Sequence, residues 1–395
     1  MYKNKKRLAK RLKKQYKNIS KKMILIGITG TNGKTTSSFL LYKYFIFNKI
    51  PVTLIGSNGI FINDNYEENI NTTPGIDIIY DVLKRSYEKN IKYIIMEVSS
   101  HAIKQYRIFG LSFKIKAITN ITLDHMDFHK CFKDYEKTKL NFLKKGNVII
   151  NSDIIQAKKI KNNLVRKVFL YGSNNNEFFF NNIKISENTI FTLNYKNKKY
   201  LIQTNLKGIF NVYNISLFIR ILTILNIFEY DKVRVFLTKN IVIPGRMNEF
   251  HYNSKLIVVD YAHTPDGIEK VLSYYKAINK KIITILGCGG NRDKTKRPIM
   301  GNISSELSDF VIYTTDNPRN ENPLLIIKDI TSGINKNNYL IEEDRKKAID
   351  IGFNLLKNYD CLLILGRGND NYYFLSDKKI YFNDIKYIKG KINNE

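Results

Sequence analysis

Short apolar runs alternate with helix-compatible stretches through the first half of the chain. Apolar residues cluster at 23–26, 91–95, 115–118 and 148–150, and each run is followed at once by a short polar or glycine-rich segment. Helix-compatible stretches such as 35–47 lie between these runs. This rhythm predicts the α/β class, with a mostly parallel sheet flanked by helices.

The pattern changes twice further along the chain. Aromatic and β-branched clusters at 168–171, 178–180, 189–195 and 200–204 predict an antiparallel extension of the sheet, and a helix is expected near 211–225. Pro244-Gly245 breaks the pattern, and a second series follows, with strands expected near 256–259, 282–286, 310–314 and 361–365. We therefore expect an N-terminal segment (1–22), a first α/β domain (23–243) and a smaller Rossmann-like α/β domain (244–395).

A candidate phosphate loop stands directly after the first apolar run. Residues 27–36 read Gly-Ile-Thr-Gly-Thr-Asn-Gly-Lys-Thr-Thr, so Gly30 and Gly33 precede Lys34 and Thr35. Glycines let backbone N–H groups close around an anion, a lysine adds positive charge, and a threonine hydroxyl can reach a phosphate-bound Mg²⁺. The strict G-x-x-x-x-G-K-[ST] spacing is not met, because Ile28 stands at its first glycine. A plain glycine turn is the alternative; we favour a P-loop-type nucleotide site.

Composition narrows the class of protein. The 395 residues are 43% hydrophobic and carry a formal net charge of +30. The charge could indicate a nucleic-acid partner, but the excess Lys comes with abundant Asn, Ile, Tyr and Phe throughout, which favours compositional bias. Three widely spaced cysteines with no C-x-x-C pair indicate neither a disulfide framework nor a zinc site, so a reducing cytoplasm is expected. No apolar run approaches the ~20 residues needed to span a bilayer.

The N-terminal segment is strongly basic. Residues 1–22 contain eleven Lys or Arg and no acid, and they lack the apolar core of a secretory signal. Leu8, Leu12 and Ile19 could line one helical face, so a transit peptide or a surface-binding helix is an alternative. We expect residues 1–22 to form a solvated basic segment that leads into the first domain.

Polar groups that suit a metal–phosphate site follow several predicted strands. Glu97 ends the run 91–97, and a second polar run, 120–129, follows another strand. Ligands of open α/β sheets bind at the carboxyl ends of strands. Four of the five histidines (His101, His125, His129 and His263) fall in such runs, which favours ligation or substrate contact over isolated core histidines. Mg²⁺ prefers oxygen ligands, so a carboxylate with substrate phosphates is expected.

These runs together resemble the signatures of the Mur ligases, the ATP-dependent amino-acid ligases of peptidoglycan synthesis. The matching runs are 30–36, 96–101, 120–129, 208–214, 244–247 and 260–266, in the family's order over about residues 23–370. The runs 71–74, 287–298 and 316–319 are most similar to the MurE subgroup, which adds the third residue to UDP-N-acetylmuramoyl-L-alanyl-D-glutamate. The family's N-terminal domain, which grips the uridine diphosphate, has only the short basic segment in its place.

The resemblance implies roles for individual residues. Lys34, Glu97, His125 and Lys139 would be catalytic, and Thr35, Glu97, His125 and Lys139 would bind Mg²⁺, with Lys139 as the family's carbamylated lysine and Lys137 as its rival. ATP would contact Gly30, Thr31, Asn32, Gly33, Lys34, Thr35, Thr36, Asn211, Arg246, Asp260 and His263. The muramoyl-dipeptide would contact Thr72, Thr73, Ser99, Gln105 and Arg107. The incoming amino acid would contact Arg292, Asp316, Asn317, Pro318, Arg319, Gly366 and Asp370.

The run Asp316-Asn317-Pro318-Arg319 matches the motif for meso-diaminopimelate rather than lysine. An arginine fork holds a second carboxylate bidentately, and lysine has none to offer. The resemblance implies an acyl phosphate on the D-glutamyl side chain, attacked by the amine of diaminopimelate, with domain closure hinged near Pro244. A monomer without a membrane or nucleic-acid partner is expected. The alternatives are a related ligase such as a folylpolyglutamate synthase, or a truncated non-catalytic nucleotide- or nucleic-acid-binding protein.

Overall fold

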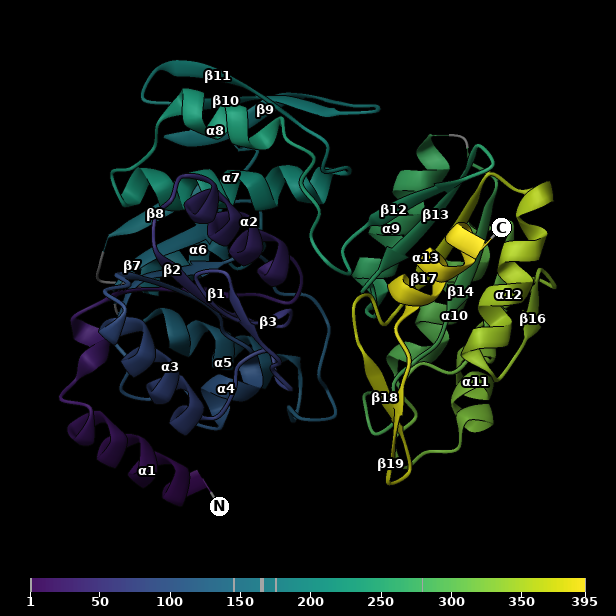
Figure 1. Cartoon of the computed structure of the whole chain (residues 1–395), viewed down its shortest axis with the longest axis horizontal. Coiled ribbons are helices and arrows are strands. Elements are labelled where there is room, and N and C mark those ends of the chain that lie inside the picture. The colour runs from purple at the N-terminus through teal and green to yellow at the C-terminus, as the bar shows by residue number, and fades with distance from the viewer. Residues whose placement is uncertain (1, 145, 164–166, 175, 279, 395) are drawn as a thin grey trace. The chain divides into compact units, whose positions relative to one another are not determined.

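The computed structural model describes residues 2–144, 146–163, 167–174, 176–278 and 280–394. Its internal contacts divide the chain into two compact units. The first comprises the chain up to Thr122 together with Cys131–Ile241, and the second comprises Leu123–Lys130 together with Val242–Glu395 (Figure 1). The short segment Leu123–Lys130, here called the strap, thus belongs to the second unit although both of its neighbours in sequence belong to the first.

The first unit is built on an eight-stranded sheet in the order β4-β3-β2-β5-β1-β6-β7-β8. Its strands are β1 (Ile24–Thr29), β2 (Val52–Gly56), β3 (Gly59–Ile62), β4 (Asn65–Glu67), β5 (Tyr93–Glu97), β6 (Phe113–Ile118), β7 (Asn147–Asn151) and β8 (Val168–Tyr171). In this spatial order the neighbours from β2 to β8 pair in parallel, and only the pairs β2–β3 and β3–β4 at one edge are antiparallel, so β3 is the one reversed strand of this sheet among the described residues. The predicted mostly parallel α/β sheet is confirmed. This order places the ends of β1, β2, β5 and β6 side by side.

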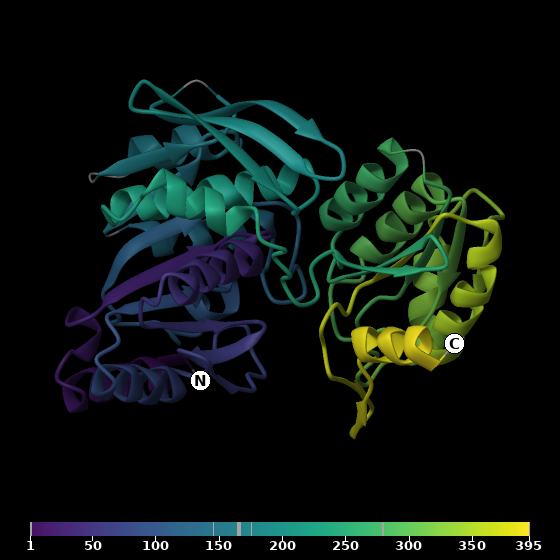
Figure 2. The same ribbon diagram turned by 45° about the horizontal axis from the view of Figure 1, so that its top comes forward.

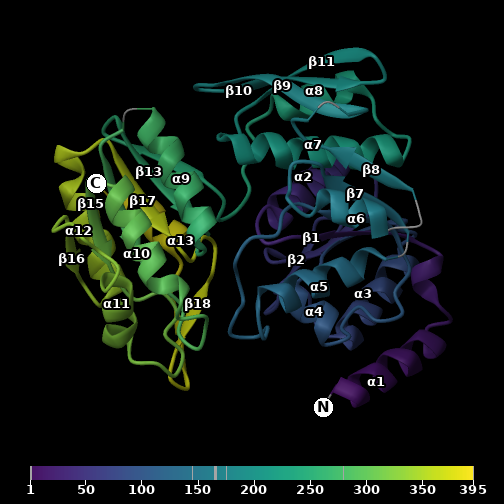
Figure 3. The same cartoon turned by 180° about the vertical axis from the view of Figure 1, so that it is seen from behind.

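Helices cover both faces of this sheet. They are α1 (Tyr2–Gln15), α2 (Lys34–Phe47), α3 (Ile76–Glu88), α4 (Ser100–Lys104), α5 (Phe132–Leu143), α6 (Ala157–Asn163), α7 (Ile209–Ile224) and α8 (Tyr230–Leu237). Figures 1 and 3 show α2 and α7 on one face and α3, α4 and α5 on the other. Helices α2 and α7 are buried along most of their lengths, since α2 packs on the sheet and on α7, and α7 packs on the main sheet and on a second sheet.

The predicted antiparallel extension at 166–206 differs from the structure in its position. Strand β8 continues the main sheet in parallel, because α6 provides the crossover from β7. Strands β9 (Phe178–Ile185), β10 (Thr189–Tyr195) and β11 (Lys198–Thr204) form a separate antiparallel sheet. Alternate residues of β10 are buried, so this sheet packs one face over α7, as Figure 2 shows.

The second unit is a six-stranded sheet in the order β12-β13-β17-β14-β15-β16. The strands are β12 (Asn248–Tyr252), β13 (Lys255–Asp260), β14 (Ile282–Leu286), β15 (Phe310–Tyr313), β16 (Tyr339–Ile341) and β17 (Cys361–Leu365), with a hairpin of β18 (Tyr372–Leu375) and β19 (Lys378–Tyr381). Side chains of β13 alternate between two cores: one lies against α9 (Pro265–Ala277), α10 (Lys296–Leu307) and α11 (Pro323–Thr331), the other against α12 (Arg345–Leu355) and α13 (Asp384–Asn394). The predicted second α/β series is present, and only β12 is antiparallel in its sheet.

The expectation of a solvated N-terminal lead-in is wrong. Residues Tyr2–Gln15 form α1, in which Ala9 and Leu12 are buried, and the short 3-10 helix Ile19–Lys21 follows. The Tyr16 ring stacks on Tyr80 of α3 at a centroid distance of 5.3 Å. Ala9, Leu12 and Tyr16 recur at helical spacing, and this stripe packs on the first unit while the charged positions between them face solvent.

Among the described residues, every helix is too short or too polar to serve as a membrane span.

Two glycines in helices of the second unit give a matched test of its packing. A Cβ at Gly301 of α10 would lie far closer than 3.0 Å to the Ile330 carbonyl oxygen of α11, whereas a Cβ at Gly390 of α13 would meet nothing within 4 Å. We predict that Gly301→Ala lowers the free energy of unfolding by about 1–3 kcal/mol, because α10 and α11 must move apart. Gly390→Ala should leave it unchanged or raise it by up to about 1 kcal/mol. Urea unfolding of both variants measures this, and equal effects would contradict the close packing of α10 on α11.

Candidate functional site

The phosphate loop joins β1 to α2 and has no space for side chains at its two key glycines. Gly30 has φ 145° and Gly33 has φ 83°, which are positions that favour glycine. A Cβ at Gly30 would clash with Oγ1 of Thr119, and a Cβ at Gly33 would clash with Oδ1 of Asn214. The backbone can therefore curl tightly at the end of β1 and present the first turn of α2, as anion binding requires.

Two lysines bring positive charge to the same carbonyl group of this loop. Lys34 Nζ donates to the Gly30 oxygen at 2.9 Å and to the Thr31 oxygen at 2.7 Å. Lys139 Nζ, from α5, also donates to the Gly30 oxygen, at 2.7 Å. Lys139 is buried and its rival Lys137 is exposed, so only Lys139 reaches the loop.

Glu97 is a buried carboxylate at the end of β5. Its Oε2 accepts from Thr35 Oγ1 at 2.9 Å, and its Oε1 accepts from the Ser57 backbone N–H at 2.9 Å. A Cβ at Gly56 would clash with this carboxylate, so glycine gives Glu97 its space. The structure thus brings together Thr35 and Glu97, the hydroxyl and carboxylate expected to bind Mg²⁺.

The residues expected to contact the muramoyl-dipeptide form one network around Glu97. Thr73 Oγ1 donates to the Glu97 carbonyl oxygen at 2.7 Å and accepts from the Ser99 N–H at 3.1 Å. Arg107 donates to the Thr73 carbonyl oxygen at 2.7 Å and to Gln105 Oε1 at 2.7 Å. Thr72 meets Ser57, which also contacts Glu97. Hydrogen bonds therefore link all five predicted residues to Glu97, Thr73 directly and the others through Thr73 or Ser57.

The other loop residues hold the turn in shape. Thr31 Oγ1 bonds the Tyr135 hydroxyl at 2.9 Å, and Asn32 N–H donates to Asn120 Oδ1 at 2.9 Å. Thr36 is buried in α2. Asn211, at the start of α7, accepts a hydrogen bond from Asn214 at 3.0 Å, and Asn214 in turn lies against Gly33.

His125, the fourth predicted catalytic residue, lies on the strap of the second unit rather than with Lys34 and Glu97 in the first. It has φ 61°, and its Nε2 lies 3.1 Å from Asp124 Oδ2. Its place beside the nucleotide stays a prediction. Across the described ranges, no three His, Cys, Asp or Glu side chains form a metal cluster. These residues therefore suit a metal ion that is bound mainly by phosphate oxygens and by a single carboxylate.

In the second unit, Arg246, Asp260 and His263 surround Tyr261. The Arg246 guanidinium stacks 4.3 Å from the Tyr261 ring centroid. Asp260 accepts the N–H groups of Met247 and Ala262, both at 2.7 Å. His263 Nδ1 lies 2.7 Å from the Tyr261 carbonyl oxygen. Burial lowers the pKa of His263 to about 4, and the Lys296 ammonium contributes to this shift.

The residues expected to hold the amino acid gather at the ends of β14, β15 and β17. Asp316 Oδ2 is buried without a hydrogen-bond partner among the described residues. A Cβ at Gly366 would clash with this oxygen, so the glycine leaves one side of it open. Burial raises the pKa of the Asp316 carboxyl, and Asp370 lies near enough to Tyr261 to influence its pKa. Such an oxygen suits an ammonium group as its missing partner.

Two arginines stand close together beside this carboxylate. Arg319 has φ 52° and donates to the Gly290 carbonyl oxygen at 2.7 Å. Arg292 lies near enough that its charge, after burial, lowers the pKa of Arg319. Asn317 fixes the β18 backbone through the Phe374 N–H at 3.0 Å, and Pro318 packs against Gly290. Paired guanidinium groups suit a carboxylate, which would relieve their repulsion.

Several residues that contact the predicted site were given no role in the sequence analysis. Ser57 and Asn214 touch Glu97 and Gly33, and Asp124 and Lys296 form a buried ion pair at 3.4 Å. Ser57 follows an apolar run, 52–55, so its position at a strand end was a signal available in the sequence.

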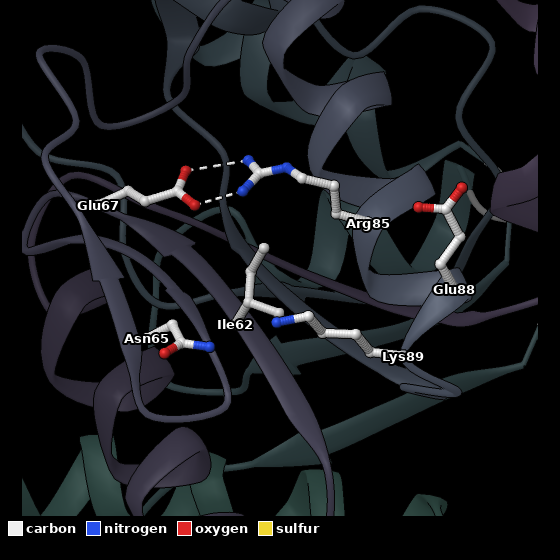
Figure 4. A pocket seen from close by; sticks show the side chains of 6 residues that line it. All are labelled: Ile62, Asn65, Glu67, Arg85, Glu88 and Lys89. Carbon is white, nitrogen blue, oxygen red and sulfur yellow. Dashed lines mark hydrogen bonds and ion pairs between the residues drawn. The ribbon is translucent and has the colours of Figure 1, made fainter.

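A separate shallow pocket lies between the β3–β4 edge and α3 (Figure 4). Its lining residues are Ile62, Asn65, Glu67, Arg85, Glu88 and Lys89. The Arg85 fork is already satisfied by Glu67, with 2.9 Å between Nη2 and Oε2, and by Asp81 at 2.8 Å. The pocket contains none of the predicted site residues.

Two sequence profiles and several known proteins show which family the chain belongs to. The sequence profile of the Mur ligase middle domain matches residues 28–221, and that of the Mur ligase glutamate ligase domain matches residues 245–368. The chain belongs to the Mur ligase family. It is 39% identical to the UDP-N-acetylmuramoyl-L-alanyl-D-glutamate--2,6-diaminopimelate ligase 1 of Clostridium acetobutylicum, over 94% of this chain and 79% of that protein. It is 38% identical to the corresponding ligase of Helicobacter pylori, over 93% of this chain and 83% of that protein.

Solved structures agree on the Mur ligase fold. A solved UDP-N-acetylmuramoyl-L-alanyl-D-glutamate--2,6-diaminopimelate ligase is 28% identical, with a TM-score of 0.64 over 94% of this chain and 78% of that one. A Mycobacterium tuberculosis folylpolyglutamate synthase complexed with ADP and AMPPCP has a TM-score of 0.75 over 91% of both chains. Its identity of 15% shows a shared fold alone.

The two lysines of α5 allow a test of the carbamylation prediction in this Mur ligase. We predict that Lys139→Ala lowers ATP-dependent phosphate release at least about 100-fold, because the loop loses a buried charged partner, while Lys137→Ala stays within about 2-fold. If Lys139 works as a carbamate, added acetate should restore part of the activity of Lys139→Ala. Rescue by a short alkylamine would instead mean that the ammonium form is the active one.

The lowered pKa of His263 predicts a stability change with pH. The unfolded chain takes up a proton below about pH 6.5 at this residue, whereas the folded chain does so only near pH 4. Stability is therefore full above pH 6.5 and is lost as the pH falls toward 4. Melting temperatures between pH 7.5 and 5 should fall less in His263→Gln than in the wild type. The exposed His251→Gln is the matched control, and identical profiles for all three proteins would contradict the role of burial at His263.

Proposed function

We propose that this Mur ligase adds meso-diaminopimelate to UDP-N-acetylmuramoyl-L-alanyl-D-glutamate in an ATP-dependent step of peptidoglycan synthesis. The names of its relatives at 35–39% identity support this activity. The observation that carries the proposal for this chain is the pairing of an open, buried Asp316 oxygen with two neighbouring arginines. Such a site offers one partner for an ammonium group and one for a carboxylate, which is the chemistry of an amino-acid substrate.

The first unit is the proposed nucleotide and muramoyl-dipeptide half. Lys34 would hold the terminal phosphates of ATP, and Thr35 with Glu97 and a carbamylated Lys139 would hold Mg²⁺. His125, on the strap of the second unit, is the proposed ligand of a second Mg²⁺. The metal, when bound, screens the negative charge of the triphosphate. Thr72, Thr73, Ser99, Gln105 and Arg107 would orient the dipeptide so that its carboxylate faces the terminal phosphate.

The reaction then needs alignment and charge neutralisation from the chain. The terminal phosphoryl group of ATP passes to the D-glutamyl side-chain carboxylate, giving an acyl phosphate and ADP. The free amine of diaminopimelate attacks the acyl carbon, phosphate leaves from the tetrahedral intermediate, and the nitrogen loses a proton. Lys34 offsets the negative charge during the first transfer. Asp316 and Asp370 would hold the ammonium group that does not react, while Arg292 and Arg319 hold its carboxylate.

We further propose that the reaction takes place in the cytoplasm, by a monomer and without a nucleic-acid partner. Cys131, Cys288 and Cys361 are free thiols, which fits a reducing compartment.

Phosphate release from the purified protein tests the function. The expected result is ATP turnover that requires both UDP-muramoyl-dipeptide and diaminopimelate. Turnover with glutamate instead would favour a folylpolyglutamate synthase, and a salt-sensitive shift of DNA without amino-acid-dependent turnover would favour the non-catalytic alternative.

Arg319 is predicted to set the amino-acid preference. Arg319→Ala should raise KM for diaminopimelate relative to lysine by about 10- to 100-fold, because a charge-assisted pair to the second carboxylate is lost. Arg319→Lys should not restore the preference, since a lysine lacks the bidentate fork. The exposed Arg234→Ala is the control. Steady-state kinetics with both amino acids measure the ratio, and an unchanged ratio in Arg319→Ala would refute this role.

A further inference from the structure

The residues that flank the strap in sequence are bonded to the phosphate loop within the first unit. Just before it, Thr122 N–H donates to Thr31 Oγ1 at 3.0 Å. Just after it, Tyr135 in the first turn of α5 places its hydroxyl 2.9 Å from the same Thr31 oxygen. The segments that enter and leave the strap therefore contact the same side chain of the phosphate loop, and a change in the path of the strap is passed to Thr31 along the chain.

Residues in the middle of the strap pair with Arg292 and Lys296, which lie elsewhere in the second unit. The buried Asp124 pairs with the buried Lys296 at 3.4 Å. Three residues further on, Asp127 pairs with Arg292 at 3.5 Å, and 42% of the Arg292 side chain is exposed. The first pair is an anchor, since breaking a buried ion pair is costly, whereas the second is weak and open to exchange.

Arg292 therefore has two possible anionic partners. One is Asp127 of the strap, and the other is the carboxylate of the amino acid that the proposed function places between Arg292 and Arg319. The side chains of these two arginines both lie close to Gly289, where an added Cβ would come within 3.0 Å of Arg319 Nη1 and 3.4 Å of Arg292 Cγ. A substrate carboxylate that pairs with both guanidinium groups removes Arg292 from Asp127.

We propose that the strap couples the amino-acid site to the phosphate loop, with Asp127 as the residue that competes with the substrate carboxylate for Arg292. This inference rests on the proposed function. When the amino acid takes Arg292, the strap loses its pairing through Asp127, and the restraint that this pair places on Thr31 along the chain is reduced. The loop then closes more readily on a nucleotide. By linkage, nucleotide binding favours amino-acid binding by the same factor.

The Asp127→Asn variant separates this role from a merely structural one. Removing a competing anion should tighten diaminopimelate binding by about 2- to 5-fold, as expected for one exposed ion pair, whereas structural damage would weaken it. The same variant should bind a non-hydrolysable ATP analogue as tightly without diaminopimelate as the wild type does with it. Asp127 is outside the proposed catalytic and binding residues.

The matched control is Asp134→Asn in α5. It removes another carboxylate, which pairs with Lys104 within the first unit. Isothermal titration calorimetry would give the dissociation constants of AMPPNP and of diaminopimelate, each with and without the other, with UDP-muramoyl-dipeptide present throughout. Melting temperatures would confirm that both variants are folded.

The expected result is a reciprocal gain of about 2- to 5-fold in the wild type and in Asp134→Asn, and a gain near 1-fold in Asp127→Asn. Independent binding in the wild type, or equal coupling in Asp127→Asn, would overturn the inference while leaving the proposed function intact. Failure of the wild type to bind either ligand would overturn the proposed function itself, and this inference with it.

Discussion

The close approach of polar side chains to three glycines is the constraint on which the nucleotide site depends. Thr119 stands against Gly30, Asn214 against Gly33, and the Glu97 carboxylate against Gly56. Each contact joins a different strand or helix to the loop region, so a side chain at any of the three glycines would push a neighbouring element away. Because these contacts fix the loop, Lys34 and Thr35 are held at the start of α2 before any ligand arrives, which reduces the ordering cost of binding.

The order of the strands explains why Glu97 contacts both the phosphate loop and Ser57. Strand β5 lies between β1 and β2, so the end of β5 meets the phosphate loop on one side and Ser57 on the other. Hydroxyl and N–H donors hold this buried carboxylate in position. Carboxylate oxygens are the ligands that Mg²⁺ prefers.

The sequence was informative wherever chemistry and strand ends coincide. Lys34, Thr35, Glu97 and the Thr73–Arg107 network are adjacent in space because each follows a strand or lies beside one, and that position can be read from hydropathy. Ser57 needs the order of the strands as well, which local pattern does not specify. The strap could not be foreseen, since eight residues leave one unit and join another through the Asp124–Lys296 pair. The apolar face of α1 was visible in the sequence, but the eleven basic residues around it favoured a solvated segment over packing.

The cations that support the fold and the cations of the proposed site have different hydrogen-bond partners. Arg297 and Arg345, both buried, pair with carboxylates: Arg297 with Glu321 and Asp329, and Arg345 with Asp384. Arg107 and Arg319 instead donate to the backbone carbonyl oxygens of Thr73 and Gly290, and Arg107 also donates to the Gln105 amide oxygen. A neutral oxygen orients a cation without cancelling its charge, so these two arginines remain able to attract anionic substrates. Arg292 differs, because its partner Asp127 is a carboxylate at an exposed position, where a substrate anion can replace it.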